Sequence, residues 1–268
     1  MKICILSVCF FRHQEIKSSL ESIYNSLYDT KNVDLCAVHL PTPNSDKVKN
    51  EIISSLFENK YLIDYPKNHV SGGLLSATLE TDIVKNSDYV AVTETDIRIL
   101  NKGCIEKCCE VLEQNKEFGF VTPEYNIDDP YHEYAVKKAG WIWPSYPYKK
   151  NINITQNRGY QLLVWRTKDW IDFCNNVKSG TYITNSNKSY GIVDGNSFLW
   201  CINQRKTVGV LQDYFIIHNG WDVYKTPSVD QEYLDYKNKL ISENNIWSEN
   251  NTNGTETYEF KLYNYSKI

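Results

Sequence analysis

An apolar strand and a pair of acids adjoin in YVAVTETD, residues 89–96. Residues 89–93 have the tyrosine, valine and threonine content of a buried strand, and Glu94 and Asp96 follow it directly. Side chains two residues apart on an extended chain point the same way, so both carboxylates can face one site. Ligands of open α/β sheets bind beyond the carboxyl ends of the strands, and oxygen ligands suit Mg²⁺ or Mn²⁺. The segment predicts a metal site, against the alternative of a strand end with solvated acids.

Strand-like and helix-like segments alternate before these acids. Apolar runs predict strands at 2–8, 33–40, 61–65 and 88–93. Periodic apolar stripes predict helices at 13–28, from Ser45 or Asp46 onward, and from Gly72 and Gly73 to Val84. Alternation of this kind is typical of a mainly parallel sheet with helices on both faces.

The pattern changes after residue 99. Helices are expected at 102–113, 168–176 and within 191–203, and strands at 119–123, 161–166 and 208–217. Residues 125–156 are rich in Pro, Tyr, Trp and Asn and show weak periodicity. The polar tail after Trp221 predicts a loop with a loose helix around 231–240. Since no internal repeat or linker is visible, we expect one domain over 1–268.

Composition excludes several classes of protein. The 268 residues are 41% hydrophobic, enough for a core, and their net charge of -4 disfavours a nucleic-acid partner, which usually selects a basic surplus. The 8 cysteines include no CxxC pair and no histidine at zinc-finger spacing, so a reducing, cytoplasmic location is expected. The first eight residues read as a strand and not as a signal peptide. No apolar run approaches the ~20 residues of a membrane helix, so no integral membrane segment is expected.

Two later segments carry residue types that catalysis uses. Asp194 precedes an apolar helix at 197–202, where a carboxylate could take a proton from a hydroxyl; the alternative is a helix N-cap. His218 follows an apolar strand at 210–217, where imidazole is a tolerable third ligand for Mn²⁺; the alternative is a core or loop histidine.

The order of these motifs resembles that of the GT-A glycosyltransferases, especially the inverting family 2 group, over about residues 1–220. The resemblance implies an α/β fold with a mainly parallel nucleotide-binding sheet, flanked by helices, and an irregular aromatic-rich acceptor region. Within this single domain, residues 1–100 would form the nucleotide-sugar-binding half, residues 101–220 the acceptor and catalytic half, and residues 221–268 a polar C-terminal tail. It also implies that Glu94 and Asp96 hold Mn²⁺ or Mg²⁺, with His218 completing the shell and Asp194 as the base. Glu94 departs from the family's Asp-x-Asp-type motif.

The resemblance further implies a set of contacts to the nucleotide-sugar, from Val8, Cys9, Phe10, Arg12, His39, Asn68, Gly72, Gly73 and Thr95. Glycines let the backbone approach a ligand closely, and a helix N-terminus favours anions. His39 stands where the family often has an Asp that reads the base. Arg12 can meet a phosphate, or it can be a solvated residue at a helix start.

Aromatic residues gather at 140–148, including Trp141, Trp143 and Tyr146. Tyrosine and tryptophan have an apolar face and a polar edge, which suits stacking on sugar rings. We interpret the segment as an acceptor-binding wall, and a hydrophobic cover over the sheet is the alternative.

The leading hypothesis is an inverting transfer of a sugar from a UDP-, GDP- or dTDP-sugar to a hydroxyl of a glycan, glycoprotein or glycolipid. A glycolipid acceptor would bring the chain to a membrane surface as a peripheral protein. A sugar-nucleotide nucleotidyltransferase is the rival enzyme, but residues 9–12 lack its Gly-rich basic loop. An oxidoreductase is disfavoured because no GxGxxG follows the first strand. A non-catalytic sugar-binding module would keep the aromatic residues and lose the acids.

Overall fold

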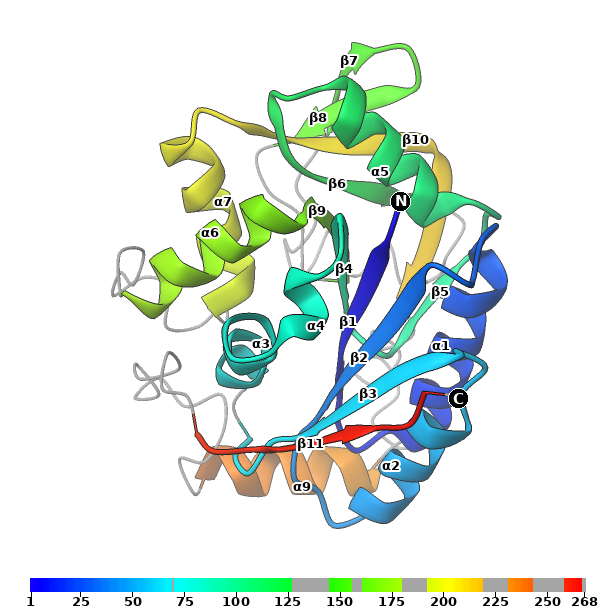
Figure 1. Cartoon of the computed structure of the whole chain (residues 1–268), viewed down its shortest axis with the longest axis vertical. Coiled ribbons are helices and arrows are strands. Elements are labelled where there is room, and N and C mark those ends of the chain that lie inside the picture. The colour runs from blue at the N-terminus through cyan, green and yellow to red at the C-terminus, as the bar shows by residue number, and fades with distance from the viewer. Residues whose placement is uncertain are drawn as a thin grey trace.

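A single sheet forms the centre of the computed structural model, which describes residues 1–68, 70–126, 145–155, 161–179, 192–218, 231–242 and 258–266 (Figure 1). The strand order is β11-β3-β2-β1-β4-β9-β6-β10-β8-β7, and β5 pairs with β10. The strands are β1 (Ile3–Cys9), β2 (Val33–His39), β3 (Asn59–Asp64), β4 (Tyr89–Thr93), β5 (Ile97–Ile99), β6 (Phe118–Tyr125), β7 (Tyr146–Lys149), β8 (Ile152–Thr155), β9 (Leu162–Arg166), β10 (Thr207–His218) and β11 (Lys261–Asn264).

The first half of the sheet is parallel. β1 pairs in parallel with β2 and with β4, and β2 pairs in parallel with β3. These strands are largely apolar on both faces because helices cover both sides. Beyond β4 the sheet is mixed: β9 runs antiparallel to β4 and β6, whereas β10 runs parallel to β6. The predicted α/β class with a sheet flanked by helices is confirmed.

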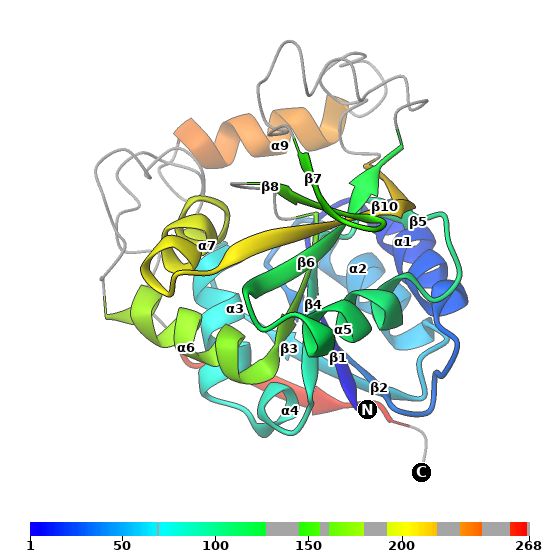
Figure 2. The same ribbon diagram turned by 90° about the horizontal axis from the view of Figure 1, so that it is seen from above.

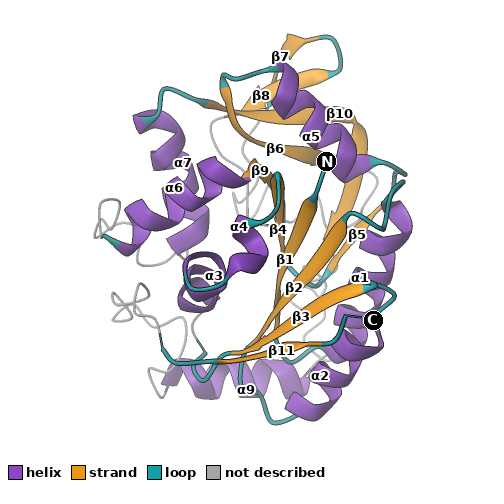
Figure 3. Cartoon of the chain, in the orientation of Figure 1, coloured by secondary structure: helices purple, strands orange, loops and turns teal. Residues whose placement is uncertain are grey.

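Helices cover the two faces of the sheet in separate layers (Figures 2 and 3). Ile3 and Ile5 of β1 pack into one hydrophobic cluster and Cys4 and Leu6 into the other, as the alternation of a strand requires. The first cluster includes side chains of α1 (His13–Ser26), α2 (Ser45–Ser54) and α5 (Cys104–Gln114). The second includes side chains of α3 (Val70–Leu79), α4 (Asp82–Lys85), α6 (Thr167–Lys178) and α7 (Ile192–Asn203). The remaining described helix is α9 (Gln231–Ser242).

The helix predicted from Gly72 to Val84 is wrong in its extent. The structure has two helices there, α3 and α4, and α3 begins at Val70. The break lies at Thr81, whose backbone is extended and whose hydroxyl donates to the carbonyl of Ala77 at 2.6 Å. Threonine favours such local bonds over a continued helix.

The polar tail is also more ordered than predicted, because part of it returns to the sheet. β11 pairs antiparallel with β3, from Lys261 opposite Asp64 to Asn264 opposite Tyr61. All of its side chains are exposed, so it lacks the apolar alternation that identifies a strand. The short strands β5, β7 and β8 were missed for a related reason, since three or four residues show too little periodicity.

All eight cysteines are buried and free. Burial raises the pKa of the thiols of Cys9 and Cys174, so these side chains stay protonated and pack as small apolar groups. Among the described residues, no helix has the length and apolar character needed to cross a membrane.

Gly103 precedes α5 with a φ of 73°, in the left-handed region, and its amide donates to the carbonyl of Ser26 at 2.6 Å. A Cβ atom there would lie 1.9 Å from a ring carbon of Tyr28. We expect Gly103→Ala to lower the free energy of unfolding by about 1–3 kcal/mol, because alanine is strained at this φ and must displace the ring. The shift of the urea unfolding midpoint, at an unchanged dependence of the unfolding free energy on urea concentration, measures this loss. Glu21→Ala on the exposed face of α1 is the control. An unchanged midpoint would contradict the argument.

Candidate functional site

The strand order changes direction between β1 and β4. From β1 the chain adds β2 and β3 on one side and then β4 on the other. Parallel α/β sheets bind ligands at such a switch point, beyond the carboxyl ends of the strands. The segments that leave these two strand ends are 10–12 and 94–96, which contain predicted site residues.

Three interactions hold the acidic segment in this place. The hydroxyl of Thr95 donates to the carbonyl of Val8 at 3.0 Å and is buried, which ties the segment to the end of β1. The amide of Glu94 donates to the carbonyl of Gln161 at 3.2 Å. β5 then pairs antiparallel with the end of β10, with Ile97 opposite His218. The pairing brings a histidine from late in the chain to the two acids.

The structure brings together the three predicted metal ligands. The Nε2 atom of His218 lies 2.9 Å from Oε2 of Glu94 and 3.2 Å from Oδ1 of Asp96. One ligand atom from each residue falls within 4.8 Å of the other two. The His218 side chain is 9% exposed, whereas those of Glu94 and Asp96 are 34% and 24% exposed. The cluster therefore opens to solvent on its acidic side.

The charges of the cluster favour a cation at this point. Burial by itself lowers the pKa of His218, but the carboxylates of Asp96 and Glu94 outweigh it and raise that pKa to about 10. Burial raises the pKa of Asp96, and the nearby His218 and Arg12 more than offset this, so its pKa is lowered. Two carboxylates and an imidazole are a donor set that suits Mn²⁺. Binding of Mn²⁺ would displace the proton from Nε2 of His218, because a histidine ligand must be neutral.

The segment after β1 packs against a helix from the far end of the chain. Tyr236 of α9 stacks on Phe11 with ring centroids 5.4 Å apart, and on Phe10 at 6.0 Å. Arg12 lies 5.9 Å from the ring centroid of Tyr233, and one of its guanidinium nitrogens lies 3.6 Å from Oδ2 of Asp96. In both views α9 lies off the carboxyl ends of the parallel strands (Figures 1 and 2). The sequence analysis did not predict this contact. The signal for it was the pair Tyr233 and Tyr236, which lie three residues apart on the predicted helix and so share one face.

Comparison with known proteins supports the fold. No family model matches the sequence, and no curated protein matches it. The mannosyltransferase PcManGT from Pyrobaculum calidifontis, solved with GDP-Man and Mn²⁺, superposes with a TM-score of 0.54 and 12% identity. That match covers 81% of this chain and 56% of that one. The chain therefore has a GT-A-like fold.

A second solved protein has the same GT-A-like fold. TarS of S. aureus, residues 1–349, matches with a TM-score of 0.50 and 11% identity over 80% of this chain and 60% of that one. Its complex with UDP-GlcNAc matches with a TM-score of 0.51 and 10% identity over 81% and 58%. The chain thus spans between half and two thirds of the length of these neighbours.

In this GT-A-like fold His39 ends β2 and contacts the end of β3. Its Nδ1 atom lies 2.8 Å from Oδ1 of Asp64, and Lys49 holds Oδ2 of the same carboxylate at 2.6 Å. Burial outweighs Asp64 and lowers the pKa of His39, so the ring is neutral at pH 7. Its Nδ1–H then donates to the carboxylate, and Nε2 is left as a hydrogen-bond acceptor. Nε2 is buried and has no hydrogen-bond partner among the described residues.

Three other predicted contact residues lie just before α3 or in its first turn. Asn68 lies just before this helix, and its buried Oδ1 has no hydrogen-bond partner within the described ranges. Gly72 and Gly73 are buried inside the helix. A Cβ atom on Gly73 would lie 2.7 Å from Cγ1 of Val38, so this glycine lets α3 approach β2. Val8 and Cys9 are also buried, at the end of β1.

The catalytic and acceptor predictions fall largely outside the described part. Asp194 lies in the first turn of α7, and its side chain is outside the described residues. Trp141 and Trp143 are outside the described residues. Tyr146 begins the edge strand β7 and is 59% exposed. The predicted acceptor wall therefore stays a prediction.

Proposed function

We propose that the chain is a metal-dependent glycosyltransferase that moves a sugar from a nucleoside-diphosphate sugar to an acceptor hydroxyl with inversion. The observation that carries this proposal is the Glu94–Asp96–His218 cluster at the β1–β4 switch point of a GT-A-like fold. Ligand sets of this composition occur where a cation meets a diphosphate. Arg12 beside Asp96 adds a fixed positive charge at the same place.

Glu94, Asp96 and His218 would hold Mn²⁺ or Mg²⁺ in this reaction. When bound, the ion supplies charge stabilisation to the diphosphate that leaves. Thr95 keeps the acids in position through its bond to the carbonyl of Val8. Arg12 would bind a phosphate oxygen through its guanidinium, which accommodates such oxygens in a planar fork.

Asp194 would act as the base at the start of α7. Its carboxylate takes the proton of the acceptor hydroxyl while that oxygen attacks the anomeric carbon. The bond from the anomeric carbon to the diphosphate breaks in the same step, and the nucleoside diphosphate leaves. Attack from the face opposite the leaving group inverts the anomeric configuration.

His39 favours a base that carries a ring N–H. Its buried Nε2 accepts a hydrogen bond in the neutral ring. Uracil, thymine and guanine each present a ring N–H, which supports the proposed UDP-, dTDP- or GDP-sugar. The solved neighbours carry GDP-Man and UDP-GlcNAc in their own sites. The proposed acceptor is a hydroxyl of a glycan, glycoprotein or glycolipid, and the proposed location is cytoplasmic.

Nucleotide binding tests the proposal directly. We expect UDP or GDP to raise the melting temperature only when Mn²⁺ is present, because a ligand that binds the folded state stabilises it by about 2.7 kcal/mol at 100 times its Kd. Asp96→Asn should abolish the shift, and Asp213→Asn, an exposed carboxylate outside the cluster, should retain it.

The products then separate the rival enzymes. Release of a nucleoside diphosphate from the nucleotide-sugar supports a glycosyltransferase, whereas release of a nucleoside triphosphate with pyrophosphate supplied supports a nucleotidyltransferase. A metal-independent shift with NAD would contradict both. A shift with free sugars and none with any nucleotide would indicate a sugar-binding module.

A further inference from the structure

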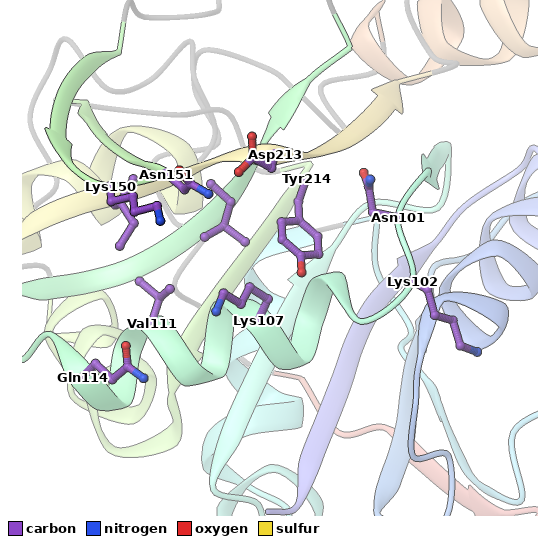
Figure 4. A pocket seen from close by; sticks show the side chains of 11 residues that line it. Asn101, Lys102, Lys107, Val111, Gln114, Lys150, Asn151, Asp213 and Tyr214 are labelled. Atoms are coloured by element: carbon purple, nitrogen blue, oxygen red, sulfur yellow. The ribbon is translucent and has the colours of Figure 1, made fainter.

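A cavity of about 560 Å³ lies between α5 and the β8–β10 pair (Figure 4). It is lined by Asn101, Lys102, Lys107, Val111, Gln114, Lys150, Asn151, Ile152, Leu211, Asp213 and Tyr214. Asp213 precedes His218 by five residues along β10, and no lining residue belongs to the acidic cluster. Small-molecule sites have volumes of about 300–1,000 Å³, so the cavity is of the right size for a ligand.

A bulge in β10 creates one wall of the cavity. Leu211 pairs with Pro123 of β6, and the next pair along is Phe215 with Glu124. Three residues of β10, 212–214, therefore have no partner on β6. Proline has no amide hydrogen for the ladder, which favours such an irregularity at this point. The bulge turns Asp213 and Tyr214 out of the regular sheet and into the lining of the cavity.

Hydrogen bonds hold the bulge from both sides. On one side the amide of Gln212 donates to the carbonyl of Asn151 at 3.2 Å. Asn151 itself has a φ of 60° in the two-residue turn between β7 and β8. On the other side the amide of Phe215 donates to Oδ1 of Asn101 at 2.7 Å. The wall is therefore preorganised, which lowers the entropy that a ligand must overcome.

The lining combines an apolar floor with a polar rim. Val111, Ile152 and Leu211 are buried and belong to the hydrophobic cluster beneath α5. Tyr214 is half-buried, and Figure 4 shows its hydroxyl pointing toward α5. Burial raises the pKa of this hydroxyl, so it stays protonated at neutral pH and can donate a hydrogen bond.

Two amines dominate the charge of the rim. Lys107 forms an exposed ion pair with Glu110 at 2.9 Å, a contact of small energy that a ligand can replace. Lys150 makes no ion pair with any residue in the described part of the chain. Lys102 points away from the other labelled side chains (Figure 4) and donates to the carbonyl of Asn25 at 2.9 Å. Of the side chains that line the cavity, three are lysines and one, Asp213, is an acid, on a chain whose net charge is -4.

We propose that this cavity binds a sugar unit of an acidic oligosaccharide. The apolar face of a sugar ring packs on Tyr214 and the floor, and its hydroxyls bond Asp213 and the amide of Asn151. Its carboxylate is held by Lys150 and Lys107 through charge-assisted hydrogen bonds. The choice of a carbohydrate over another polar anion rests on the proposed transferase function. A polymer held here keeps its end at a raised local concentration near the acidic cluster.

Calorimetry with tetragalacturonate tests the inference, with maltotetraose as the neutral counterpart of equal length. We expect tetragalacturonate to bind about tenfold more tightly than maltotetraose and less tightly as salt rises. Lys150→Gln should weaken tetragalacturonate binding about tenfold, because it removes a charge-assisted bond at an exposed position where folding is not at risk. Lys168→Gln, an exposed lysine on α6, is the matched control and should bind as the unaltered chain does.

Two further measurements keep this inference apart from the proposed function. Asp96→Asn should leave tetragalacturonate binding unchanged, and Lys150→Gln should leave the Mn²⁺-dependent shift by UDP or GDP unchanged. Absence of tetragalacturonate binding, or binding that Lys150→Gln does not weaken, would overturn the inference while the transferase proposal stood. Inorganic phosphate competing as strongly as tetragalacturonate would show a simple anion site and overturn the carbohydrate assignment.

Discussion

Asp96→Asn is expected to lower the rate of sugar transfer by about 10²–10³-fold while the chain stays folded. Asparagine keeps the shape of the side chain and removes the charge that would meet the cation. Metal ions contribute several kcal/mol of charge stabilisation, and each ~1.4 kcal/mol is tenfold in rate. In the folded chain the Asp96 carboxylate also lies 3.2 Å from His218 and 3.6 Å from Arg12. The variant therefore also removes the negative charge that these two cationic side chains face.

The initial rate of nucleoside diphosphate release measures this effect. EDTA should abolish the activity of the unaltered chain, and added Mn²⁺ or Mg²⁺ should restore it. Glu21→Gln is the control, since it removes an exposed carboxylate on α1 that belongs to neither the acidic cluster nor any proposed binding site. Full activity in EDTA would remove the metal from the mechanism.

Asp194→Asn is expected to lower turnover by about 10²–10⁴-fold, the contribution typical of general-base catalysis. The amide cannot take the proton of the acceptor hydroxyl. It can still accept a hydrogen bond from a backbone amide in the first turn of α7, so stability should hardly change. The Mn²⁺-dependent melting shift by UDP or GDP should persist, because a base that acts on the acceptor hydroxyl is not needed to bind the nucleotide.

Single-turnover rates per folded molecule measure the effect of Asp194→Asn. Asn203→Ala at the opposite, exposed end of the same helix is the control. If Asp194→Asn lost stability and kept its turnover, the residue would serve to stabilise the first turn of α7 and the base would lie elsewhere.

Much of the first half of the fold could be predicted because each element there has a local pattern. β1, β2 and β4 are buried throughout and largely apolar, as parallel strands covered on both faces are, and α1 carries its apolar residues at helical spacing. The exposed edge strands β7 and β11 have no such pattern, because hydrogen bonds to a neighbouring strand place them and burial does not. The bulge of β10 escaped prediction because it depends on which strand lies beside it.

The sequence by itself determined the kinds of group at the site: two carboxylates after a buried strand, and a histidine after a late one. Only the tertiary structure decided that His218 lies 2.9 Å from Glu94, 124 residues away, and that Asp64 and Lys49 hold His39. It also decided that Gly73 serves the packing of α3 on β2. Contacts of this kind depend on strand order and register. Strand order and register are set by the packing of the whole sheet, whereas hydrophobic periodicity and local composition report only on a few neighbouring residues.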